Sequence, residues 1–139
     1  MNFVVAKDEV EVVEIKVESE LKITNAPWND SLSNPNSVMF VELKGDLEEK
    51  MDKVFCNETN TIESQMNDSC HTEVTGFSEG SINVFFFIIR MELKQLLPTV
   101  AELLADMQLA IVESEGIIGD FKIAKESVKI SKFFDFPTA

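Results

Sequence analysis

The stretch that most constrains the fold is an apolar run in the middle of the chain. No charged residue occurs from Ser81 to Ile89, and most residues of this run are β-branched or aromatic. The run is too short to cross a bilayer as a helix. It follows the turn signal Ser78-Glu79-Gly80, so Gly80 and Ser81 are expected at the turn end of a buried strand. We expect the rest of the chain to be arranged to cover this strand.

The first half of the chain changes its hydrophobic period once. Residues 13–23 alternate between apolar and charged side chains, which predicts a strand with one face in water. Residues 24–36 are rich in Pro, Asn and Ser and predict a loop, which Trp28 is expected to anchor to the core. From Ser37 to about Phe55 apolar residues recur at intervals of three and four, which predicts a helix capped by Ser37 or Asn34.

The second half is expected to hold two strands, a helix and a last strand. A short strand from His71 to Phe77 is expected to form a hairpin with the apolar run, and the polar residues 57–69 are expected to form an exposed loop. A second helix is expected from Pro98 to Glu115-Gly116, with an apolar face made of Val100, Leu103, Leu104, Met107 and Ile111. The last strand is expected at Phe121–Ser131, and the pattern assigns no structure to the tail Phe133–Pro137.

The order of these elements predicts an α+β fold. Strand, helix, strand, strand, helix, strand is the order of a ferredoxin-like sandwich (β-α-β-β-α-β), in which two helices cover one face of an antiparallel sheet. The 139 residues suit a single domain, with a core expected at about residues 12–131.

Composition excludes several classes of partner. The formal net charge of −13 argues against nucleic acid or an anionic membrane surface, because both require a basic face. No stretch is expected to insert into a membrane, and Met1 to Lys7 lacks the apolar core of a signal peptide. The chain holds one Arg, one His and no Tyr, so we expect no conventional active site, no cofactor and no metal. It is expected to be either cytosolic or a segment of a larger extracellular protein.

Three N-glycosylation sequons begin at Asn29, Asn57 and Asn67. Each alone is a weak signal because such triplets are common by chance. All three lie in predicted loops, where they would be accessible, and together they favour an extracellular chain. The alternative is loops that are rich in Asn and Ser for their turn chemistry.

Cys56 and Cys70 flank one of these loops. Oxidised, they would close a loop of about 15 residues and contribute roughly 3 kcal/mol to stability. The alternatives are two free thiols, or a poor metal site with His71. Two Cys and one His fall short of a tetrahedral zinc set, and their spacing matches no zinc finger, so the disulfide is favoured.

Three stretches of the chain resemble the SEA domain, a module named for sperm protein, enterokinase and agrin that is common in membrane mucins. Residues 21–40 resemble its first strand, loop and first helix. Residues 77–84, with Gly80-Ser81-Ile82-Asn83-Val84, resemble its turn and its Gly-Ser-Val-Val-Val motif. Residues 119–128 resemble the close of the module. The likeness covers about residues 12–131, and the Gly-Ser turn is its most specific part.

The resemblance implies self-cleavage between Gly80 and Ser81. Many members of the family cut themselves at this bond during folding, by an N-to-O acyl shift in which the Ser hydroxyl attacks the Gly carbonyl. Folding strain then takes the place of a catalytic base, and Gly tolerates the strained backbone. The resemblance further implies a domain of two fragments that bind each other without a covalent link. Each fragment is then the partner of the other, and the two would separate under force.

Asn83 departs from the family motif, which has an apolar β-branched residue at this position. Alternation along the strand puts Ser81, Asn83, Phe85 and Phe87 on one face and Ile82, Val84, Phe86 and Ile88 on the other. An Asn83 on the wet face would leave the strand unaffected. A buried Asn83 would weaken the packing that generates the strain.

The leading interpretation is therefore an extracellular or cell-surface module that cleaves itself at Gly80-Ser81. A second is an uncleaved extracellular spacer, or a domain that binds an extracellular protein or glycan. A third is a cytosolic ferredoxin-like interaction domain with free thiols. A conventional enzyme is the least favoured class, because no catalytic constellation is visible.

Overall fold

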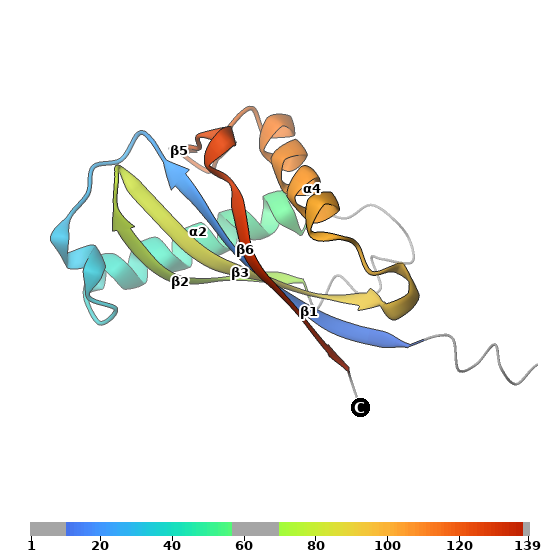
Figure 1. Cartoon of the computed structure of the whole chain (residues 1–139). Helices are drawn as coiled ribbons and strands as arrows, with labels where there is room; N and C mark the ends of the chain where they lie inside the picture. The colour runs from blue at the N-terminus through green and yellow to red at the C-terminus, as the bar shows by residue number, and fades with distance from the viewer. Residues whose placement is uncertain (1–10, 57–69, 138–139) are drawn as a thin grey trace, which may run out of the picture.

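The computed structural model describes residues 11–56 and 70–137 (Figure 1). Its strands are β1 (Val12–Ile23), β2 (His71–Glu79), β3 (Ile82–Leu93), β4 (Ile117–Ile118), β5 (Phe121–Lys122) and β6 (Lys129–Pro137). Its α-helices are α2 (Val38–Phe55) and α4 (Val100–Glu113). Short 3₁₀ helices lie at η1 (Asp30–Ser33), η3 (Lys94–Leu96) and η4 (Lys125–Ser127).

The main sheet has the strand order β2-β3-β1-β6, and every neighbouring pair in it is antiparallel. Both α-helices of the described residues lie on one face of this sheet (Figure 1), where their apolar side chains join the inner side chains of the strands in one core. The small pair β4-β5 lies beside it. The predicted α+β, ferredoxin-like arrangement is confirmed.

Strand β1 lies between β3 and β6, and its side chains alternate without interruption. The residues that point to the helices are buried and their neighbours are half-exposed along the whole strand. This alternation fixes a continuous register with β3, since a shift of one residue would turn the apolar set into water, whereas the ladder with β6 shifts its register between Glu18 and Ser19. The strand predicted at residues 13–23 is thus confirmed.

Both helices begin at side-chain caps that satisfy free backbone N–H groups. The hydroxyl of Ser37 accepts from the N–H of Phe40 at 3.1 Å, so Ser37 rather than Asn34 caps α2. Thr99 and Glu102 form a reciprocal capping box at the start of α4. The predicted apolar face of α4 is correct at Leu103, Met107 and Ile111, which are buried. Leu104 packs partly buried against the core, whereas Val100, predicted on the same face, is the first residue of the helix and is 46% exposed.

The position of the last strand differs from the prediction of Phe121–Ser131. The chain makes only the two-residue strand β5 there, then turns through η4, and β6 begins at Lys129 and runs to Pro137. Ser127 fixes this turn, because its hydroxyl accepts from the N–H of Lys22 at 2.8 Å and donates to the carbonyl of Ala124. The tail that the pattern left unassigned is therefore the strand that pairs with β1.

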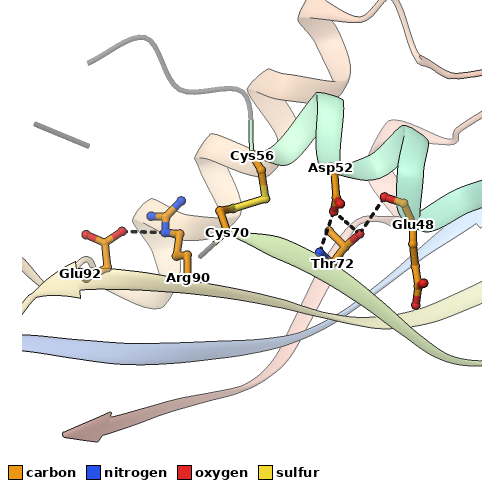
Figure 2. The surroundings of a disulfide bond; sticks show 7 residues. All are labelled: Glu48, Asp52, Cys56, Cys70, Thr72, Arg90 and Glu92. Atoms are coloured by element: carbon orange, nitrogen blue, oxygen red, sulfur yellow. Dashed lines mark hydrogen bonds and ion pairs between the residues drawn. A yellow bond between two sulfur atoms is a disulfide. The ribbon is translucent and has the colours of Figure 1, made fainter. Parts of the chain in front are cut away.

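The outer edge of β2 is covered by acidic side chains of α2 (Figure 2). The N–H and the hydroxyl of Thr72 both donate to Asp52 Oδ1, at 2.7 and 2.8 Å. The N–H of Val74 donates to Glu48 Oε2 at 2.8 Å. Backbone groups that would otherwise be open at this edge are thereby paired with α2.

We expect Asp52→Ala to lower the free energy of unfolding by about 1–3 kcal/mol, because it leaves the N–H of the buried Thr72 without its acceptor, whereas the Thr72 hydroxyl keeps the carbonyl of Glu48 at 3.2 Å. Urea denaturation followed by circular dichroism measures this loss. Glu49→Ala is the matched control, since Glu49 is exposed on the same helix, and its expected change is within about 0.5 kcal/mol. Equal losses in the two variants would contradict a role for Asp52 at the strand edge.

Cys56 follows α2 and Cys70 precedes β2, and the two form a disulfide with their Cα atoms 5.7 Å apart (Figure 2). The bond therefore ties the end of α2 to the start of the edge strand. The predicted disulfide is present in the structure, and the alternatives of free thiols and a metal site with His71 do not fit it.

Candidate functional site

The Gly80-Ser81 turn joins β2 to β3 as a two-residue hairpin connection. Glu79 pairs with Ile82 on either side of it. Both turn residues have positive φ, 141° for Gly80 and 52° for Ser81. Hairpin turns with positive φ at both positions favour Gly, Asn and Asp. Gly80 suits such a conformation, whereas Ser81 occupies a region that costs an L-residue about 1–2 kcal/mol.

The strands on both sides of the turn are fixed in the core. Phe77, Ile82 and Val84 are 8%, 2% and 0% exposed, and the ring of Phe77 packs edge-on against that of Phe40 with centroids 5.1 Å apart. Phe77 also pairs with Val84 across the ladder. The hairpin therefore cannot slip by one residue to relax its turn without exposing these side chains.

The turn itself is open to water. Ser81 is exposed and Gly80 is half-buried, whereas the strands that hold them are buried on their inner face. His71 lies at the opposite end of β2 from the turn. In residues 11–56 and 70–137 no cluster of three or more His, Cys, Asp or Glu side chains is arranged to hold a metal ion. The chemistry available at the turn is that of the Ser81 hydroxyl beside a peptide bond held between fixed strands.

Asn83 lies on the outer, half-exposed face of β3, in line with the predicted alternation. Its neighbours Ile82 and Val84 point into the core, so the amide does not interrupt the inner packing. Asn83 Nδ2 instead donates to Ser78 Oγ at 3.1 Å and to the carbonyl of Glu79 at 3.3 Å. The sequence pattern did not predict these two hydrogen bonds. The only indication of them was an Asn within a run of residues that otherwise strongly favour β structure.

Of the predicted glycosylation sites, Asn29 is exposed at the start of η1. Its side-chain oxygen accepts from the N–H and the hydroxyl of Ser31, at 2.9 and 2.7 Å, so it also caps this turn. Asn57 and Asn67 lie outside the described residues. The structure does not bring Asn29, the disulfide and the Gly80-Ser81 turn together into one site.

Within the part of the chain that the structure describes, no helix is both long and apolar enough to span a membrane. A family model described as the SEA domain matches residues 15–92, more than half of the chain. The match runs from β1 to the end of β3 and includes the turn. No curated protein matches the chain.

Proposed function

The chain belongs to the SEA domain family, and on that premise we propose that it is an extracellular module that cleaves itself between Gly80 and Ser81. The observation that carries this proposal is the positive φ of both turn residues, between strands whose inner side chains are fixed in the core. After cleavage the two pieces, residues 1–80 and 81–139, stay together as one domain.

The proposed reaction needs only the turn and water. Ser81 Oγ attacks the carbonyl carbon of Gly80, a C–O bond forms, and the hydroxyl proton passes to the nitrogen of Ser81 as the C–N bond breaks. The product is an ester between Gly80 and the Ser81 side chain, with a free α-amino group on Ser81. Water, which reaches this exposed turn, then hydrolyses the ester to a Gly80 carboxylate and restores the hydroxyl.

Strain provides a driving force where no general base is at hand. A Ser hydroxyl is a weak nucleophile at its ordinary pKa. The left-handed conformation of Ser81 stores about 1–2 kcal/mol. Each 1.4 kcal/mol released on the way to the transition state accelerates the reaction about tenfold.

The sheet topology explains how a cut domain stays assembled. Residues 1–80 contribute β1, α2 and β2, and residues 81–139 contribute β3, α4 and β6. In the order β2-β3-β1-β6 the strands therefore alternate between the pieces, so each neighbouring pair joins one piece to the other. We call these pairings the two-piece joint. Loss of a single turn bond leaves its ladders intact.

The two-piece joint would be non-covalent. Cys56 and Cys70 both belong to the first piece, so their disulfide does not link it to the second. SEA domains occur in extracellular and cell-surface proteins, where a disulfide persists and where the exposed Asn29 can carry a glycan. An extracellular location therefore agrees with the chemistry of the chain.

The proposal is tested by the mass of freshly folded, unglycosylated protein under denaturing, non-reducing conditions. We expect two species, residues 1–80 and 81–139, whose masses sum to the 15.6 kDa chain plus one water. Ser81→Ala removes the nucleophile and should give one intact chain. Ser131→Ala removes an exposed hydroxyl elsewhere and should be cut like the wild type.

Hydroxylamine during refolding checks the ester step. Because it attacks esters faster than amides, it should convert the end of the first piece to a Gly80 hydroxamate. One intact 15.6 kDa species in both the wild type and Ser81→Ala would overturn self-cleavage. The fold would then serve as an uncleaved spacer or a binding module for an extracellular protein or glycan.

A further inference from the structure

We propose that Asn83 restrains the cleavage turn, holding Gly80-Ser81 in its intact conformation and thereby setting how fast the bond is cut. This inference rests on the proposed self-cleavage and assigns its regulation to one side chain. The restraint is a feature of this chain, since the resembling motif carries an apolar residue at this position.

The Asn83 amide is bonded to both residues that precede Gly80. A side-chain amide nitrogen has two protons to donate. One goes to Ser78 Oγ at 3.1 Å and the other to the carbonyl oxygen of Glu79 at 3.3 Å. Ser78 is also the cross-strand partner of Asn83. The amide thus ties the strands together directly beneath the turn, on the face away from the core.

The bond to Glu79 acts next to the bond that would be cut. The carbonyl oxygen of Glu79 and the nitrogen of Gly80 belong to one planar peptide unit. Holding this oxygen therefore holds the plane on one side of Gly80, and rotation of Gly80 must break or stretch the bond from Asn83. The attack of Ser81 Oγ requires the turn to twist away from its resting geometry, so the restraint is lost as the barrier is approached. An interaction that is present in the ground state and weakened in the transition state slows a reaction.

Asn83 also occupies the space beside Gly80. A Cβ at position 80 would lie 2.9 Å from Asn83 Nδ2, which is closer than such atoms approach one another. Gly80 is therefore required for its φ of 141° and also for the room that its missing side chain gives to the amide. A larger residue at position 80 would therefore have to displace the Asn83 amide.

The test compares cleavage rates of variants during refolding. Each chain is purified unfolded in guanidinium, refolded by dilution and quenched in acid at intervals, and the fraction present as residues 81–139 is measured by mass. Asn83→Val and Asn83→Ala should both be cut about tenfold faster than the wild type, the rate equivalent of one net hydrogen bond. Ser78→Ala removes one acceptor and should give a smaller acceleration.

Thr75→Val is the matched control. The hydroxyl of Thr75 also bonds across the hairpin, to the carbonyl of Phe85 at 3.2 Å, but it lies farther from the turn. Its removal should leave the rate unchanged. A residue that only stabilised the fold would slow cleavage when lost, so the direction of the change separates restraint from a structural role. Unfolding of each variant in a Ser81→Ala background provides the stability to set beside its rate.

The outcomes distinguish the two proposals. Cleaved wild type with equal or slower cleavage in Asn83→Val and Asn83→Ala would overturn the restraint and leave self-cleavage standing. An intact wild type together with a cleaved Asn83→Val would overturn self-cleavage of the natural chain and support the restraint, because loss of the Asn83 amide would then be what permits the cut. Absence of cleavage in every chain would overturn both proposals, because release of the restraint would then have no effect.

Discussion

Replacing Phe86 by alanine is expected to lower the free energy of unfolding by about 3–5 kcal/mol. Phe86 is 0% exposed and lies in the middle of β3, where it pairs with Ser19 on one side and Val74 on the other. Its ring stacks on that of Phe55 with centroids 5.9 Å apart. Truncation leaves a cavity where β3 of the second piece packs against α2 of the first. The strands around this cavity cannot fill it without losing their register.

Guanidinium denaturation in a Ser81→Ala background measures this loss, because the chain is then continuous and its unfolding does not depend on protein concentration. Phe134→Ala is the matched control. Phe134 is also a phenylalanine in the main sheet, but it is 37% exposed on the outer face, and we expect its loss to be about 1 kcal/mol or less. In the cleaved form Phe86→Ala should also separate the pieces on size-exclusion chromatography. Similar losses in the two variants would contradict this account of the core.

The double variant Cys56→Ser, Cys70→Ser is expected to lose about 3 kcal/mol of stability. The bond joins residues 14 apart in sequence and restricts the unfolded chain more than the folded one. The urea midpoint should therefore fall. The dependence of the free energy on urea should become steeper, because the unfolded chain exposes more surface.

Chemical reduction is the control for the disulfide. Dithiothreitol should bring the wild type to the stability of the double variant and should leave the variant unchanged. Equal midpoints for oxidised and reduced wild type would mean that the bond contributes nothing to stability. Because both cysteines lie in the first piece, neither treatment should change whether the pieces migrate separately under denaturing conditions.

Those features of the fold that depend on local pattern could be predicted from sequence. The alternation of β1 and the spacing of apolar residues in α2 follow from neighbouring residues and are confirmed, and Ser37 is the one of its two predicted caps, Ser37 and Asn34, that the structure uses. The start of β6 could not be predicted in this way. It depends on a hydrogen bond from the backbone of Lys22 to Ser127, two residues far apart in sequence, and on consecutive Phe side chains that do not alternate with polar ones.

The candidate site shows the same division. Gly80-Ser81 could be located from its place before an apolar strand, and its positive φ values are consistent with the predicted turn. The cut itself stays a prediction. The hydrogen bonds of Asn83 to Ser78 and Glu79 could not be foreseen, because alternation gives the face of a side chain and not its partners. The bond between Asp52 and Thr72 escaped prediction for the same reason.

The alternation of the pieces across the sheet bears finally on how long a cut domain lasts. Neither piece contains two adjacent strands of the main sheet, whose order is β2-β3-β1-β6. No strand pair of the main sheet therefore remains once the pieces dissociate. Dissociation and global unfolding are then the same event, and the lifetime of the assembled pair equals the native-state lifetime of the domain, which for small domains ranges from under a second to days. The time that the two pieces stay together would therefore be set by the unfolding rate of the packed core and not by a binding equilibrium between two folded partners.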